Sequence, residues 1–280
     1  MVVGTMNLLD ENGMDEQQFL AQYNQKEYPC PSVAVDTVAF AISEGSQDNY
    51  RKLPSKQLCL LLIQRAGHPH IGQWALPGGF VEPDETVGSA ACRELEEETG
   101  VADSYIEQLF AFSTPGRDPR AWVISVAHMA LVSSGKLEAI AGSDAQSAKW
   151  FVLNASSGNG QVALSLKAGD VELSATVALN GEQLEPEIIK NDGLAFDHAK
   201  IIAYALMRLR GELEYSDLAF NLMPEKFTLS ELQQVYELLS GKRLLSAAFR
   251  RKVNSFVVQT GEYTQNAGHR PSQIYVRNKE

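Results

Sequence analysis

Residues 79–101 combine helical spacing with an unusual concentration of carboxylates. Glu94, Glu97 and Glu98 stand three and four residues apart, so they share one face of a helix expected over about residues 87–98 and ended by Gly100. The opposite side of this helix is apolar and consists of Val87, Ala90, Ala91 and Leu95. The segment therefore predicts a helix that packs on one side and presents a cluster of negative charge on the other.

Such a cluster is unfavourable unless a cation neutralises it, because like charges at this spacing destabilise a helix. A hard divalent cation such as Mg²⁺ or Mn²⁺, which prefers oxygen ligands, would remove the repulsion. Arg93 stands four residues before Glu97 and can orient a carboxylate. We therefore predict a metal site formed by Glu85, Glu94, Glu97 and Glu98; the alternative is a solvated acidic helix face.

The spacing of these residues resembles the Nudix signature. Its positions are filled by Gly79, Glu85, Arg93, Glu94, Leu95, Glu97, Glu98, Gly100 and Val101. The resemblance implies an α/β Nudix fold for about residues 30–153, with this helix against a mixed sheet, and substrates built from a nucleoside diphosphate. In Nudix hydrolases the helix carboxylates bind the metal and position water, which would make Glu97 and Glu98 catalytic if this chain is hydrolytic.

The surrounding pattern also indicates an α/β body. Apolar or alternating runs predict strands over about residues 33–40, 58–63, 106–112, 121–131 and 148–152. Residues 154–160, rich in Ser, Gly and Asn, predict a surface loop, and residues 162–177 predict a hairpin. Asp197 is expected to cap a helix with a stripe from Ile201 to Leu209, and a short helix is expected over residues 15–23.

Beyond Pro224 the pattern changes. Thr228 and Glu231 form a capping box that opens a helix closed by Gly241, and a second helix starts at Ser246. Two strands follow near residues 257–258 and 274–276, joined by a turn over residues 266–270. This order predicts an α+β winged helix-turn-helix domain.

Charge is divided unevenly between these two parts. Residues 225–280 hold nine basic and five acidic residues; the chain totals of 24 and 35 leave 15 basic and 30 acidic residues for positions 1–224. The basic part can attract a polyanion that the acidic part repels. We predict that duplex DNA is contacted by Lys242, Arg243, Ser246, Arg250, Arg251, Lys252, His269 and Arg270. The alternative for the basic triplet alone is a solvated helix face.

Further segments resemble the NrtR family, the Nudix-related transcriptional regulators of NAD metabolism. They are Arg117-Asp118-Pro119-Arg120, residues 194–198, and residues 227–233 through 249–252 to Arg270-Pro271. Residues 74–81 look like Nudix proteins that handle ADP-ribose. In the NrtR family, a ligand-sensing Nudix domain precedes a winged helix, the protein is a dimer on a palindromic operator, and ADP-ribose lifts repression.

This resemblance implies three regions. Residues 1–30 are an N-terminal extension, residues 31–224 are the Nudix-like domain, and residues 225–280 are the winged helix. The Nudix-like part includes an insertion at 154–190, which the resemblance does not explain, and a helix over 198–214. A bound diphosphate needs cations besides the metal, and its expected contacts are Arg65, Phe80, Arg93, Arg117 and Arg120. Core packing is the alternative for Phe80.

Two function classes remain open. One is an ADP-ribose-responsive DNA-binding repressor, and the other is a metal-dependent hydrolase of ADP-ribose or a related diphosphate. The chain has no apolar run long enough to span a membrane, and its acidic start predicts no signal peptide. Its three cysteines have no disulfide or metal spacing, which favours the cytoplasm.

Overall fold

The computed structural model describes residues 9–24, 28–45, 53–102, 104–134, 148–179, 185–264 and 271–278. The chain divides into two compact units, Met1–Pro31 and Ser32–Glu280. The first contains α1 (Glu16–Gln22), the short helix predicted from the sequence, which begins with a capping box between Asp15 and Gln18. None of the residues of α1 is buried.

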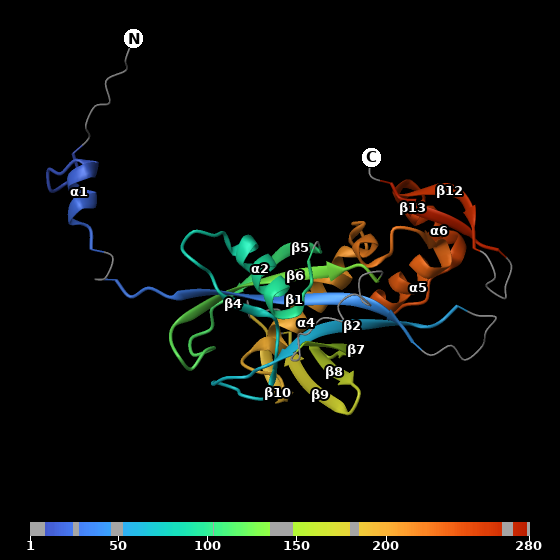
Figure 1. The fold of residues 1–280 in the computed structure, drawn as a ribbon, viewed down its shortest axis with the longest axis horizontal. Coiled ribbons are helices and arrows are strands. Elements are labelled where there is room, and N and C mark those ends of the chain that lie inside the picture. The colour runs from blue at the N-terminus through green and yellow to red at the C-terminus, as the bar shows by residue number, and fades with distance from the viewer. Residues whose placement is uncertain are drawn as a thin grey trace, which may run out of the picture. The chain divides into compact units, whose positions relative to one another are not determined.

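The second unit is built on a mixed sheet (Figure 1). Its main strands are β1 (Ser32–Glu44), β2 (Lys56–Gln64), β5 (Tyr105–Phe112), β6 (Val123–Val132), β7 (Ala148–Gly158), β8 (Gln161–Ala168), β9 (Val171–Ala178) and β10 (Glu187–Asp192). They lie in the order β10-β9-β8-β7-β2-β1-β6-β5, with β1 parallel to β6 and antiparallel to β2. Two short strands, β3 (Trp74–Ala75) and β4 (Gly78–Phe80), pair with β2 and β1. The mixed sheet confirms the predicted α/β architecture.

Two helices cover opposite faces of this sheet. Successive side chains of a strand point to opposite faces. Accordingly, Ala39 and Ala41 of β1 belong to the apolar cluster that receives Leu95 of α2 (Val87–Thr99), the predicted acidic helix. Phe40 belongs to the larger cluster, which receives Ile202 of α4 (His198–Glu212). Near the start of β1, Val35 packs against Ala90 in the first turn of α2, and Asp36 lies 3.3 Å from the Nε2 atom of His198, the first residue of α4.

The predicted surface loop over residues 154–160 is wrong. Strand β7 continues to Gly158, and only Asn159 and Gly160 form the turn to β8. Both turn residues have positive φ angles, 52° and 71°, as tight hairpins between twisted strands require. The ladder with β8 overrides the weak strand propensity of this Ser- and Gly-rich stretch, because it pairs the backbone from Val152 to Gly158. The part of the insertion that the structure describes thus extends the sheet.

The C-terminal part has the predicted winged-helix order. A 3-10 helix, η3 (Leu218–Leu222), leads to β11 (Phe227–Thr228), α5 (Leu229–Ser240), α6 (Ser246–Val253), the 3-10 helix η4 (Asn254–Phe256), β12 (Val257–Tyr263) and β13 (Gln273–Arg277). The capping box of Thr228 and Glu231 is present, and Gly241 ends α5 with a φ of 68°. The three strands form a sheet in the order β11-β13-β12. The predicted turn at 266–270 lies outside the described residues.

The large apolar cluster of the main sheet continues into this C-terminal part. Leu206 and Leu209 of α4 share one cluster with Leu232 and Val235 of α5 and with Phe249 of α6. Among the described residues, no helix has the length and apolar character needed to cross a membrane.

Candidate functional site

The acidic helix α2 packs against β1 and β4. Thr86 caps its first turn by accepting a hydrogen bond from the Ser89 amide, and Gly100 ends it in the left-handed conformation, with a φ of 73°. The side facing the sheet buries Ala90, Ala91, Leu95 and Thr99. Because this side is fixed by packing, the positions of Glu94, Glu97 and Glu98 follow from the helix itself.

Arg93 holds three of the predicted metal ligands. Its guanidinium donates to Glu85 at 2.7 Å and 3.1 Å, to Glu94 at 2.8 Å and to Glu97 at 3.2 Å. The guanidinium lowers the pKa of the Glu85 carboxyl below its ordinary value, chiefly through these hydrogen bonds. Three carboxylates therefore already converge on one positive charge. The assignment of Arg93 to ligand binding stays a prediction.

Glu98 lies apart from this group. Its Oε2 accepts a hydrogen bond of 2.8 Å from the Gly78 amide. Burial raises the pKa of the Glu98 carboxyl to about 7, and the charges of Glu94 and Asp36 add to this rise, which the Gly78 amide opposes. A buried carboxyl beside other acids is stabilised in its charged form by a cation.

Gly78 and the signature residue Gly79 allow this close packing. A Cβ atom at Gly79 would lie 2.2 Å from the Oε1 of Glu94, and one at Gly78 would lie 2.1 Å from the carbonyl oxygen of Val35. No larger residue fits at either position without displacement of the backbone or of the carboxylate. Within the described residues, no three acidic, His or Cys side chains are placed together so that they could hold a metal ion. The four-carboxylate metal site therefore stays a prediction.

A buried polar network lies beside these carboxylates. Arg117 donates to Asp197 at 2.7 Å and 3.0 Å and to Asp36 at 3.3 Å. Asp36 also accepts from Ser125 at 2.5 Å and lies 3.3 Å from the Nε2 atom of His198. The Leu76 amide donates to the Nδ1 atom of His198, so the ring proton of a neutral imidazole is on Nε2, facing Asp36.

This network was only partly visible in the sequence. Arg117 was singled out as a ligand contact, and the structure places it in the pocket with a buried side chain that two carboxylates hold. Asp197 stands at the N-cap position of α4, as expected, but its side chain makes no capping hydrogen bond, because it binds Arg117 instead. Asp36 was missed, and the available signal was a charged residue inside an otherwise apolar strand.

The charge balance of the network determines the state of Asp36. Burial alone would raise the pKa of this carboxyl, but the electrostatic interaction and hydrogen bond with His198, the charge of Arg117 and the hydrogen bond from Ser125 together outweigh burial and lower the pKa well below its ordinary value. Asp36 is therefore ionised at neutral pH. It anchors the start of α4 to β1 through His198.

The network forms the floor of a small pocket of about 60 Å³. Its lining includes Arg65, Phe80, Arg117, Arg120 and Phe196. The structure thus brings together four of the five predicted ligand contacts, all except Arg93. Arg120 forms a fork with Asp118, and its guanidinium lies 5.4 Å from the centre of the Phe80 ring, which is exposed.

The predicted DNA contacts lie on and around α6. Lys242 and Arg243 are exposed in the turn between α5 and α6, and Ser246, Arg250 and Arg251 are exposed on α6 itself. The inner side of α6 buries Phe249 and Val253. His269 and Arg270 lie outside the described residues. The exposed side of this helix is therefore basic in its last turn, while the exposed residues of its first turn, Ser246 to Ala248, are uncharged.

Lys252 differs from its two neighbours. Its Nζ donates a hydrogen bond of 2.7 Å to the carbonyl of Leu213 and lies 5.3 Å from the centre of the Tyr236 ring. Arg210 of α4 makes a second link, donating to the carbonyl of Leu239 at 3.0 Å and to Ser157 at 3.0 Å. Helix α4 therefore begins beside the pocket and ends in contact with the winged helix.

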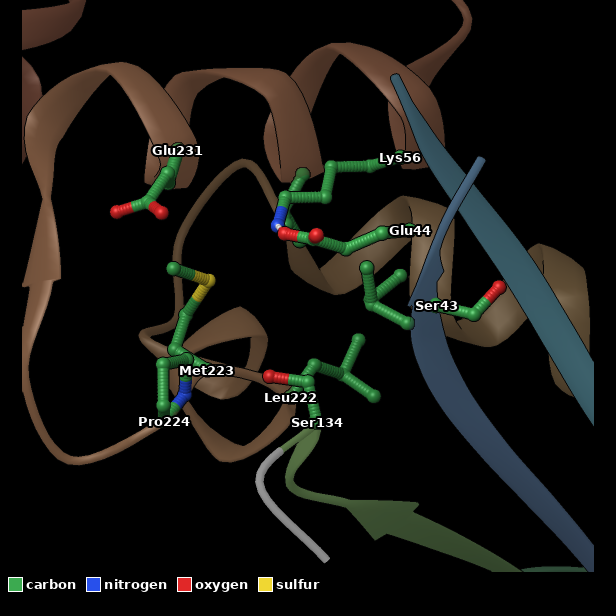
Figure 2. Close-up of a pocket in the computed structure, with 10 residues that line it drawn as sticks. Ser43, Glu44, Lys56, Ser134, Leu222, Met223, Pro224 and Glu231 are labelled. Carbon is green, nitrogen blue, oxygen red and sulfur yellow. Dashed lines mark hydrogen bonds and ion pairs between the residues drawn. The ribbon is translucent and has the colours of Figure 1, made fainter. Parts of the chain in front are cut away.

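A second pocket, of about 430 Å³, lies where the ends of β1 and β2 approach α5 (Figure 2). Lys56 and Glu44 face each other there in an ion pair of 2.8 Å, and Met223, Pro224 and Glu231 lie along the other side. The carboxylate of Glu231 accepts from both the amide and the hydroxyl of Thr228. The charged side chains of this pocket, Lys56, Glu44 and Glu231, are thus bound to other groups of the protein.

Known families match the α/β part and the winged-helix part of the chain separately. The NUDIX domain model matches residues 51–167, and the model of the NrtR DNA-binding winged helix domain matches residues 219–276. The ADPR responsive transcriptional repressor NtrR of Acinetobacter baylyi is 34% identical over 267 residues, which are 94% of this chain and 89% of that protein.

Two solved structures resemble the chain over most of its length. The MutT/nudix family protein from Enterococcus faecalis superposes with a TM-score of 0.71 at 33% identity, covering 95% of this chain and 94% of that one. Shewanella oneidensis NrtR complexed with a 27mer DNA superposes with a TM-score of 0.63 at 32% identity, covering 88% and 93%.

Proposed function

The chain belongs to the NrtR family of Nudix-related transcriptional regulators, and we propose that it is a repressor whose Nudix domain binds ADP-ribose and whose winged helix binds duplex DNA. The observation that carries this proposal is α4. It connects the pocket that holds the cationic side chains Arg65, Arg117 and Arg120 with the basic reading helix α6. One chain thereby contains a sensor, a DNA-binding surface and a direct link between them.

The ligand is expected to act through this link. A diphosphate that draws Arg117 towards itself changes the environment of Asp197 directly and that of His198 through Asp36, at the start of α4. The far end of α4 is joined to α5 and α6 by Arg210 and Lys252. A displacement of the helix would therefore alter the position of the reading helix.

We further propose that the protein works as a homodimer on a palindromic operator in the cytoplasm, where its DNA is. Two reading helices on one operator must keep a fixed separation, so a small rotation spoils contact with one half-site. The domain limits proposed from the sequence, 1–30, 31–224 and 225–280, are retained here. The DNA contacts proposed on this surface are the predicted set from Lys242 to Arg270 without Lys252, whose Nζ is bound to the Leu213 carbonyl.

The decisive experiment measures the affinity for the promoter fragment upstream of the protein's own gene cluster, by fluorescence anisotropy at fixed salt, while ADP-ribose is titrated. Coupling between two sites typically amounts to about 5- to 150-fold in affinity, and we expect ADP-ribose to weaken DNA binding within this range. Metal is omitted so that the ligand stays intact. Unchanged affinity at saturating ADP-ribose would refute the repressor mechanism.

A second candidate function is hydrolysis of ADP-ribose, and the complete acidic set of α2 favours it. The donors of Glu85, Glu94, Glu97 and Glu98 suit a hard cation, and three of them already share the charge of Arg93. A bound Mg²⁺ would supply an activated water, while these carboxylates would hold the ion. Incubation with ADP-ribose and Mg²⁺ tests this activity through the release of AMP.

A further inference from the structure

Phe196 has an unusual backbone conformation beside the pocket. Its φ angle is 48°, in the left-handed region that bulky residues rarely adopt. Both neighbours are anchored, because the Ala195 amide donates to the Trp74 carbonyl at 2.8 Å and Asp197 is paired with Arg117. Backbone strain of this kind persists where surrounding contacts impose it, and it is concentrated at functional sites.

The ring of Phe196 is covered by pocket side chains. The guanidinium of Arg65 lies 4.8 Å from its centre and that of Arg120 lies 5.7 Å from it. The ring of His70 packs edge-on at 4.5 Å between centroids. Two of the cations expected to meet a diphosphate thus rest on an aromatic ring.

These contacts close the pocket. Its volume of about 60 Å³ is far below the roughly 300 Å³ at which ligand pockets begin, so a nucleotide diphosphate enters only after Arg65, Arg120 and Phe196 separate. Their separation releases one aromatic face and two guanidinium groups. An aromatic face complements a planar base, and guanidinium groups complement phosphate oxygens.

We propose that Phe196 is a ligand-binding residue that stacks on the base of the nucleotide, and that Arg65 and Arg120 turn from its ring to the diphosphate. This inference rests on the proposed binding of ADP-ribose and specifies how the pocket recognises it. Phe196 fits this role better than Trp74, whose ring is buried against Phe151 in the core. This role also explains the strained conformation of Phe196, which directs its ring into the pocket.

The test uses the full-length protein without added metal and measures binding by calorimetry. The two probes are ADP-ribose and ribose 5-phosphate, which lacks the base. Phe196→Leu removes the aromatic face, and Phe196→Asn removes it with a residue that tolerates the left-handed conformation. Phe196→Tyr keeps the face, and Phe19→Leu changes an exposed ring of the other compact unit, Met1–Pro31.

Stacking of a base on an aromatic side chain is worth about 5- to 150-fold in affinity. We expect Phe196→Leu and Phe196→Asn to weaken ADP-ribose binding within this range and to change ribose 5-phosphate binding less than twofold. Phe196→Tyr and Phe19→Leu should bind both probes like wild type. Equal losses for both probes, or wild-type binding of ADP-ribose by the Leu and Asn variants, would overturn the stacking role. Wild-type protein that binds no ADP-ribose would instead refute the proposed function.

Discussion

Lys252 of α6 donates a hydrogen bond of 2.7 Å to the main-chain carbonyl of Leu213, the residue at which α4 ends. Arg251, the middle residue of the basic triplet, is exposed on the same helix, and its side chain makes no hydrogen bond or ion pair to another described residue. Adjacent cations on α6 therefore face different surroundings, and their contributions to DNA binding are expected to differ.

The salt dependence of DNA binding separates these two residues. Each phosphate contact adds about 0.9 to the slope of log affinity against log salt concentration. We expect Arg251→Gln to reduce the slope by about this amount if it meets a phosphate, or to cost roughly 1–3 kcal/mol with relaxed specificity if it reads a base. Lys252→Gln should leave the slope unchanged. Anisotropy titrations at four salt concentrations measure both effects, and a reduced slope for Lys252→Gln would return that residue to the DNA surface.

Arg210 is expected to transmit the ligand signal. Its guanidinium joins α4 to the end of α5 and to β7, through the carbonyls of Leu239 and Ala155. We expect Arg210→Met to bind ADP-ribose like wild type but to lose most of the ligand effect on DNA affinity. Arg208→Met is the matched control, since its partner Glu212 lies on the same helix. If ADP-ribose releases DNA equally well from both variants, α4 is not the link.

The buried carboxylate of Asp36 should make stability depend on pH. The pKa of Asp36 is lower in the folded protein than in the unfolded chain. Its contribution to the free energy of unfolding is therefore complete above about pH 4 and is lost as the pH falls towards the folded-state pKa. We expect Asp36→Asn to lower the free energy of unfolding by roughly 2 kcal/mol at pH 7, and the difference from wild type to shrink below pH 4. Urea titrations at pH 7, 5, 4 and 3 measure this. A difference that stays constant over this range would show that the ionised form of Asp36 is not what stabilises the fold.

The acidic face of α2 is expected to serve the metal and not the DNA. Glu97→Gln combined with Glu98→Gln removes two of the four proposed ligands, so Mn²⁺ binding should weaken and any release of AMP should stop. DNA affinity without ligand should stay within about twofold of wild type. Glu96→Gln, on the exposed side of the same helix, is the control. Loss of DNA binding by a folded double variant would contradict the separation of the two functions.

Local signals allowed the helix ends to be predicted. The capping box of Thr228 and Glu231 and the closing glycines Gly100 and Gly241 act within one turn, so the sequence alone contains the whole interaction. The family signature likewise located the carboxylates of α2. The capping box and the closing glycines depend on residues at most a few positions apart.

Long-range pairing could not be predicted in the same way. Arg117 meets Asp36 and Asp197 across about 80 residues of sequence, and nothing near Asp36 indicates this partner. The contact of Lys252 with Leu213 depends on how α6 packs against the end of α4. The strand at 154–158 was missed for a similar reason, because its pairing with β8 matters more than its composition.

The apolar cluster that runs from the Nudix sheet into the winged helix has a consequence for protein engineering. Leu209 of α4 and Leu232 of α5 are completely buried within it. A winged helix separated from the rest of the chain near residue 225 would expose its part of this apolar surface to water. The remaining Nudix domain would expose the other part. A chimeric repressor with a foreign winged helix therefore needs a matching face on α4 as well as the new α6. Changes of operator preference are better sought by substitution at exposed positions of α6, because such substitutions leave the shared core intact.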